Sequence, residues 1–166
     1  MPSARAPERA NRDDPPPVRR PPSGLVVRAA AVSDIAGIKQ LVLDVVSELY
    51  GDLFPGGVPP PAVQWECGLV AGLAGRIVGV VVSDDDWVED LWVASEHRGC
   101  GIGSVLLAAA EREITGRGHA EARLRVVLAN LDARRFYAAR GWTETVSYPH
   151  ERWGFAMLDM KKELAT

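Results

Sequence analysis

Residues His97 to Ser104 read HRGCGIGS, with glycines at every second position from 99 to 103, and they run on into the small and aliphatic stretch VLLAAA. From Ile102 onward the apolar residues recur three and four positions apart, which is typical of one face of a helix. The preceding stretch WVEDLWV (87–93) has the apolar residues of a strand. The sequence therefore predicts a strand, a glycine turn and a helix that begins in the turn.

Such a turn can bind an anion. The first N–H groups of a helix have no partner within the helix, and the helix dipole is positive at this end. Glycines let the oxygens of a ligand approach the backbone without meeting a Cβ atom. Arg98 adds a cationic side chain at the rim. We expect a phosphate-bearing ligand here; the alternative is a glycine turn that only tightens the corner between strand and helix.

Two common phosphate-binding motifs do not fit the turn. A P-loop needs a Gly-Lys-Ser/Thr sequence, which is absent here. A dinucleotide fingerprint needs a third glycine three positions after the second, but Gly101 is followed by Gly103 and then Ser104. A nucleotide-binding protein, which would prefer ATP or NAD, remains only as an alternative.

The composition describes a soluble protein. The 166 residues suffice for one domain with a real core, and 47% hydrophobic and 25% charged residues are ordinary values. A net charge of −3 argues against a nucleic-acid partner. Cys67 and Cys100 are too few for a disulfide framework, and no apolar run reaches the length of a membrane helix. We expect a cytoplasmic protein that binds neither membrane nor metal.

Residues 1–24 differ from the rest of the chain. They hold seven of the twelve prolines and five arginines against three acidic residues, and therefore carry a net charge of +2. Such a segment cannot bury enough apolar surface to fold. We expect a disordered tail over 1–24, either without a specific role or docking on a partner, and one domain over 25–166.

The remaining pattern indicates strands alternating with helices. A first helix has Asp34 or Ser33 as its cap and Ile35, Ile38, Val42, Val45 and Leu49 as its apolar face. A short helix is expected around residues 62–66, and another from Asn130 or Asp132 to Gly141. Strands are expected at 25–29, 68–74, 76–82, 87–93, 121–128, 142–148 and 154–160.

Several motifs in this order resemble the GCN5-related N-acetyltransferase (GNAT) family. They are Leu91-Trp92-Val93, Arg98-x-x-Gly101-x-Gly103, Leu106-Leu107, Leu124-x-Val126 with Asn130, Ala133, Phe136-Tyr137, and Gly141-Trp142. The resemblance runs from about Val26 to Leu164. It implies an α/β fold of the α+β type: a mixed, mostly antiparallel sheet of about six to seven strands, flanked by helices and splayed between the fourth and fifth strands.

The resemblance also implies a cosubstrate, acetyl-CoA, and the residues that hold it. Its pyrophosphate would lie on the glycine turn and its pantetheine arm along the strand before the turn. The matching positions are Leu91, Trp92, Val93, Arg98, Gly99, Cys100, Gly101, Ile102, Gly103, Ser104, Asn130, Ala133 and Phe136. Asn130 can instead serve only as a helix cap.

Two residues are candidates for proton transfer. Tyr137 matches the family tyrosine near the sulfur of CoA and would protonate the leaving thiolate, although it can also be a core aromatic. An alkyl amine is mostly protonated at pH 7, so a base is needed. Counting by two along the strand places Glu89 on the face of Leu91 and Val93, with Asp90 opposite. Glu89 is the predicted base; a merely solvated carboxylate is the alternative. Some relatives carry a glutamate at the position of Arg125.

The sequence does not identify the acceptor amine. Several acidic residues favour a cationic amine, or are simply solvated: Glu48, Asp52, the run 84–86, Glu89 and Asp90. Trp65, Trp87 and Trp153 either shape an apolar pocket or belong to the core. We expect an N-acetyltransferase acting on a small-molecule or peptide amine. The resemblance to the family also suggests a homodimer. The alternative from another class is a non-catalytic acyl-CoA-binding regulatory module.

Overall fold

The computed structural model describes residues 19–60 and 64–165. Its strands are β1 (Val26–Ala29), β2 (Leu69–Leu73), β3 (Arg76–Asp84), β4 (Trp87–Val93), β5 (Glu121–Val127), β6 (Thr143–Pro149) and β7 (Ala156–Glu163). Its α-helices are α1 (Ile35–Tyr50), α2 (Ile102–Gly116) and α3 (Leu131–Ala138). Short 3-10 turns are η1 (Val32–Asp34), η2 (Gly51–Leu53), η3 (Trp65–Cys67) and η4 (Ser95–His97).

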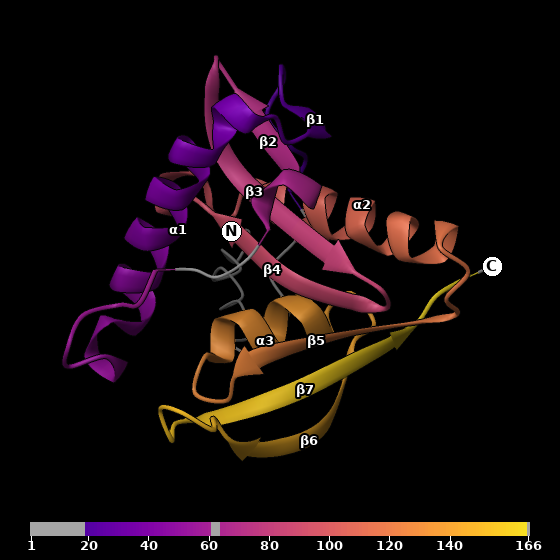
Figure 1. The fold of residues 1–166 in the computed structure, drawn as a ribbon. Coiled ribbons are helices and arrows are strands. Elements are labelled where there is room, and N and C mark those ends of the chain that lie inside the picture. The colour runs from indigo at the N-terminus through magenta and orange to yellow at the C-terminus, as the bar shows by residue number, and fades with distance from the viewer. Residues whose placement is uncertain (1–18, 61–63, 166) are drawn as a thin grey trace, which may run out of the picture.

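The strands form one mixed sheet of seven in the order β1-β2-β3-β4-β5-β7-β6 (Figure 1). β2 to β4 are an antiparallel meander, because two short turns reverse the chain between them, and β1 pairs antiparallel with β2. β4 and β5 are parallel, and β7 lies between β5 and β6, antiparallel to both. The predicted sheet is confirmed, with seven strands.

The parallel pair β4 and β5 is held together at one end only. Their register contains two residue pairs, Trp87 with Arg123 and Val88 with Leu124, and no pairing follows toward the carboxyl ends of the two strands. On its other side β4 stays paired with β3 from Trp87 through Val93. The predicted splay between the fourth and fifth strands is therefore present, and it opens beside the start of α2.

Two apolar clusters cover the two faces of the sheet. α2 and α3 pack on one face, where Leu106, Ile114 and Leu124 are almost fully buried. α1 packs on the other face through Ile38, Val42 and Val45. Figure 1 shows α1 and α2 on opposite sides of the β1–β4 half. A ligand lying in the splay therefore has access to both faces.

Some predicted boundaries change. Leu49 is 43% exposed, while Leu41 takes the core position on α1, because the buried stripe ends one turn before Tyr50. β3 extends through Asp84, so Asp85 and Asp86 alone form the turn. Residues 62 and 63 of the short helix expected over 62–66 lie outside the described residues, and the 3-10 turn η3 covers its end. Residues 1–18 of the predicted tail lie outside them as well.

Candidate active site

The glycine turn has the geometry of an anion site. Gly99 and Gly101 have φ values of 72° and 82°, and Gly101 caps α2 directly. These positive values favour glycine. Gly103 has little space for a side chain, because a Cβ atom there would lie 3.3 Å from the ring of Phe136. The first turn of α2 is thereby held against α3, with its N-terminal N–H groups facing outward from the turn.

The polar side chains predicted for the turn are already partnered. Arg98 donates to the Val93 carbonyl at 3.3 Å and pairs with Glu48 of α1 at 3.1 Å. Ser104 accepts hydrogen bonds from Arg140, at 2.6 Å from its Nη2 atom. Arg98 therefore joins α1 to the end of β4, and backbone N–H groups are left as the principal donors of the turn.

Arg140 is a site residue that sequence reasoning missed. Besides bonding Ser104, its guanidinium donates to the Phe136 carbonyl at 2.6 Å and stacks on the Phe136 ring at 3.8 Å. It thus brings a positive charge to the first turn of α2. An arginine just before Gly141 carries no sign of this contact in the sequence, because the contact joins residues 36 positions apart.

The remaining turn residues differ in what they offer. The side chain of Ile102 is 1% exposed and packs in the core, so only its backbone faces the turn. Cys100 is half-buried and its sulfur lies 3.7 Å from the Arg98 carbonyl. The carbonyl of Arg19 comes so close to Gly101 that a Cβ atom on Gly101 would clash with it. The N-terminal segment, residues 19–24, therefore crosses the glycine turn.

The strand before the turn offers a free edge. Ala94 donates its N–H to the Val78 carbonyl of β3. Because backbone groups alternate along a strand, Leu91 and Val93 turn theirs away from β3, toward the splay. Their side chains pack toward α2, whereas Trp92 packs on the α1 face. The edge of β4 near Leu91 and Val93 can thus pair with an extended ligand.

A β-bulge interrupts the alternation of side chains along β4. Val82 pairs with Asp90 and Ser83 with Val88, so Glu89 is the extra residue and is exposed. The alternation of side chains between the two faces is interrupted there, because Val88 and Leu91, three positions apart, both lie in the core on the α2 side. Asp90 faces α1 as expected. It accepts a 2.6 Å hydrogen bond from Trp92 Nε1 and lines a cavity there.

Asp90 is a carboxyl of this cleft whose pKa burial changes strongly. Burial raises the pKa of its carboxyl to about 6, against the partial opposing effect of the Trp92 hydrogen bond. Neighbouring Glu89 raises this pKa further. A carboxylate with a pKa of about 6 is ionised at pH 7.5 and is more basic than an ordinary aspartate. The sequence analysis did not predict Asp90 as the base, because only the fold shows its burial.

Tyr137 lies at the same cleft. It is 8% exposed, and burial raises the pKa of its phenol, with smaller contributions from nearby Tyr50 and Asp90. Its hydroxyl donates to no group among the described residues. Edge-to-face contacts with Phe136 and Trp142 fix the ring at 5.1 and 6.0 Å between centroids. Tyr137 therefore presents a protonated hydroxyl held in place by aromatic packing.

Asn130 joins the two halves of the cleft. Its Oδ1 atom accepts a hydrogen bond from the Ala133 N–H at 3.0 Å, so Asn130 caps α3 as the alternative interpretation held. Its Nδ2 atom donates to the Tyr50 hydroxyl at the end of α1. Tyr50 also packs its ring edge-on against Trp92 at 6.5 Å. This bridge between α3 and α1 was not predicted.

A cavity of about 280 Å³ lies on the α1 side of the splay. Its lining residues are Val42, Leu43, Val46, Phe54, Val58, Pro59, Pro60, Asp90, Trp92, His150, Trp153 and Phe155. Of the three tryptophans considered above, Trp153 lines it, whereas Trp65 is buried in the core. The acidic turn at Asp85 and Asp86 is elsewhere, paired with His119 and Arg123.

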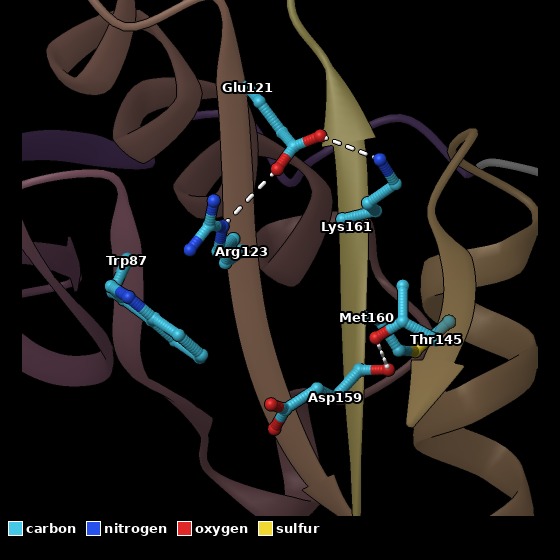
Figure 2. A pocket seen from close by; sticks show the side chains of 7 residues that line it. All are labelled: Trp87, Glu121, Arg123, Thr145, Asp159, Met160 and Lys161. Atoms are coloured by element: carbon cyan, nitrogen blue, oxygen red, sulfur yellow. Dashed lines mark hydrogen bonds and ion pairs between the residues drawn. The ribbon is translucent and has the colours of Figure 1, made fainter. Parts of the chain in front are cut away.

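A second, open depression of about 380 Å³ lies around β5 and β7, away from the glycine turn (Figure 2). In it the Glu121 carboxylate lies between two cations, 3.2 Å from Arg123 Nε and 2.8 Å from Lys161 Nζ. Trp87 at its edge is covered by Arg125 at 4.6 Å. Its charges already neutralise one another, so we place the chemistry in the splay.

Two features are absent from the described part of the chain. Across residues 19–60 and 64–165, no three His, Cys, Asp or Glu side chains are grouped so that they could hold a metal ion. Within the same ranges no helix has the length and apolar character needed to cross a membrane.

Comparison with known proteins agrees with this geometry. Residues 44–142 match the acetyltransferase (GNAT) family. An uncharacterized N-acetyltransferase of Methanocaldococcus jannaschii is 31% identical over 134 residues, covering 73% of this chain and 86% of the relative.

Two solved structures share the fold. Ard1 of Thermoplasma volcanium superimposes with a TM-score of 0.70 at 21% identity, over 86% of this chain and 99% of its own. yncA of Salmonella typhimurium, solved with its cofactor acetyl-CoA, gives a TM-score of 0.67 at 20% identity, over 87% of this chain and 96% of its own.

Fold, cleft and similarity together define an enzyme of acyl transfer. The chain belongs to the acetyltransferase (GNAT) family and is an N-acetyltransferase. Acetyl-CoA is the cosubstrate typical of this family.

Proposed function

We propose that this enzyme transfers the acetyl group of acetyl-CoA to a primary amine by direct attack in a ternary complex, within the splay between β4 and β5. The observation that carries the proposal is the end of pairing after Val88 and Leu124, directly beside the glycine turn at the start of α2. The domain that does this is residues 25–166. The residue roles below are part of the proposal.

Acetyl-CoA would lie with its pyrophosphate on the N–H groups from Gly99 to Ser104. The open helix end and its dipole favour the negative charge, and Arg140 adds a cation close by. The pantetheine arm would pair with the free edge of β4 at Leu91 and Val93. This path leads the thioester through the splay toward Asp90, on the other face of the strand.

The reaction then needs one base and one acid. Asp90 accepts a proton from the amine, whose nitrogen lone pair forms a bond to the thioester carbonyl carbon. The resulting oxyanion is stabilised by a backbone N–H near Val93. As the oxyanion collapses the C–S bond breaks, the electron pair goes to sulfur, and Tyr137 protonates the thiolate. The nitrogen then loses its second proton, which restores the phenol of Tyr137, and Asp90 releases its proton to solvent. Holding both reactants in one cleft supplies much of the rate.

Replacing Tyr137 by phenylalanine is expected to lower kcat by about 10- to 100-fold. General acids contribute at least this much, but a thiolate is already a moderate leaving group. Calorimetry should give an unchanged Kd for acetyl-CoA. The Tyr137 hydroxyl bonds no group of the described chain, so its removal leaves the shape of the site unchanged. Tyr148→Phe is the matched control, since that hydroxyl bonds Asp159 on β7. Equal rates for the two variants would remove Tyr137 from the mechanism.

Removing residues 1–21 is expected to tighten acetyl-CoA binding by about three- to tenfold. The Arg19 carbonyl occupies space over Gly101, so the N-terminal segment must move before a pyrophosphate binds. Pro22 is kept because its carbonyl accepts a bond from the Leu25 N–H. Deletion of residues 1–12 is the control, with wild-type affinity expected. Weaker binding after the longer deletion would mean that Arg19 or Arg20 contributes to the site.

The experiment that tests the function is a thiol-release assay with purified protein, acetyl-CoA and a library of primary amines. We expect amine-dependent release of CoA and a product heavier by one acetyl group. Acetyl-CoA binding without transfer to any amine would favour the non-catalytic binding module instead.

A further inference from the structure

The cavity on the α1 side of the splay is built from four separate parts of the chain. α1 contributes Val42, and the segment after η2 contributes Phe54. Trp92 comes from β4, and Trp153 and Phe155 come from the connection between β6 and β7. We call it the acceptor cavity, because it opens beside Asp90 on the face opposite the glycine turn.

Aromatic contacts fix the outer wall of the acceptor cavity. The Phe54 ring lies edge-to-face against Trp153 at 5.1 Å and against Phe155 at 5.7 Å. These contacts join the segment after α1 to the β6–β7 connection. Trp153 remains 37% exposed, and Arg152 lies over its ring at 4.7 Å. The wall is therefore an apolar surface that a ligand can reach from the rim.

The acceptor cavity has very few polar groups. Of its lining side chains only Asp90 and His150 are polar. The Nδ1 atom of His150 accepts hydrogen bonds from the N–H groups of Arg152 and Trp153, at 3.2 and 3.3 Å, so this imidazole orders its own loop. Asp90 uses Oδ1 for Trp92, and no hydrogen bond joins its Oδ2 atom to another described residue. One carboxylate oxygen is thus left for an amine.

The charges also argue against a polycationic acceptor. Asp90 is the one carboxylate among the described lining residues, and Glu48 of α1 is paired with Arg98. A volume of about 280 Å³ is at the lower end of ligand pockets, which suits one compact group rather than an extended polyamine.

We propose that the acceptor is a primary amine joined through one or two carbons to a single apolar group, aromatic or branched aliphatic, which the acceptor cavity encloses. This inference rests on the proposed function. The amine nitrogen lies at Asp90, and the apolar group packs against Phe54, Trp92 and Trp153. A small arylalkylamine and a peptide with an apolar first residue both present this chemistry.

The test is a comparison of kcat/KM values for matched amines with the full-length enzyme. 2-Phenylethylamine and 3-methylbutylamine are compared with ethanolamine and spermidine, and a peptide beginning with phenylalanine is compared with one beginning with serine. We expect the apolar members to be better substrates by about 10- to 100-fold, as apolar pockets usually discriminate. A higher kcat/KM for 2-phenylethylamine than for the phenylalanine peptide would identify the acceptor as a small amine, and the reverse order would identify it as a peptide.

Variants then link the preference to the acceptor cavity. Trp153→Ala should raise the KM for 2-phenylethylamine about tenfold and leave the KM for acetyl-CoA unchanged, while Trp153→Phe should restore most of the affinity. Trp87→Ala, in the depression of Figure 2, is the control and should behave as wild type.

Two results would overturn the inference while leaving acetyl transfer intact: preferred acetylation of spermidine or ethanolamine, or an unchanged KM in Trp153→Ala. The absence of transfer to every amine, with acetyl-CoA still bound, would contradict the proposed function itself.

Discussion

Asp90→Asn is expected to lower kcat/KM for the acceptor amine by about 100- to 1000-fold at pH 7.5, the usual effect of removing a general base. Asparagine has nearly the shape of aspartate, and its Oδ1 atom can still accept the hydrogen bond from Trp92 Nε1. The loss is therefore chemical and not a change of fold. Acetyl-CoA affinity should stay within twofold, since Asp90 faces the other side of β4.

Glu89→Gln is the matched control for this variant. It removes one charge from the adjacent residue, but Glu89 is exposed on the bulge. We expect its kcat/KM to stay within about threefold of wild type. If Glu89→Gln lowers kcat/KM strongly and Asp90→Asn does not, the base is Glu89, as the alternation along the strand predicts.

The pH dependence gives a second readout of Asp90. The rate with any amine rises with pH because the amine loses its proton. Below about pH 6 the wild-type rate should fall more steeply, since Asp90 with a pKa of about 6 gains a proton as well. Asp90→Asn should lack this change of slope.

As the pH rises, the stability of the wild type should fall while its activity increases. A carboxyl whose pKa is raised in the folded state binds its proton more tightly there than in the unfolded chain. The wild type therefore loses stability as the pH rises from about 4 to about 6. Asp90→Asn has no charge to bury, so its free energy of unfolding should exceed that of wild type by up to about 3 kcal/mol at pH 7.5, and by little near pH 4. Urea unfolding at the two pH values measures this difference.

Local patterns predicted the frame of this site well. The glycines at 99, 101 and 103 and the apolar spacing after Ile102 predicted α2 and its start, because both depend on neighbouring residues. The alternation in residues 121–128 predicted β5 for the same reason. The splay between β4 and β5 came from the resemblance to a family and not from periodicity.

The catalytic details depended on contacts that no local pattern shows. A single bulge at Glu89 interrupted the alternation of side chains along β4. The bridge from Asn130 to Tyr50 joins residues 80 positions apart, and that from Arg98 to Glu48 spans 50. The acceptor cavity likewise needs four distant parts of the chain. Such features become visible only once the sheet is assembled.

The central claim is that the pyrophosphate of acetyl-CoA lies on the turn from Arg98 to Ser104. Cys100 is the position to test it, because it lies in the turn and, unlike Gly99 and Gly101, does not have positive φ. Cys100→Asp places a negative charge within a few ångströms of the proposed pyrophosphate. Repulsion there of about 2 kcal/mol corresponds to about a 30-fold loss of affinity. An acidic residue at a helix N-terminus favours folding, so the thermal midpoint should not fall.

The most direct measurement is calorimetric titration of wild type, Cys100→Asp and Cys100→Asn with acetyl-CoA. Asparagine has the shape of aspartate without its charge. We predict saturable binding by wild type and Cys100→Asn with Kd values within about threefold, and binding at least about 30-fold weaker in Cys100→Asp. Equal affinity in all three proteins would place the pyrophosphate away from this turn, and the glycines would then serve only the corner between β4 and α2.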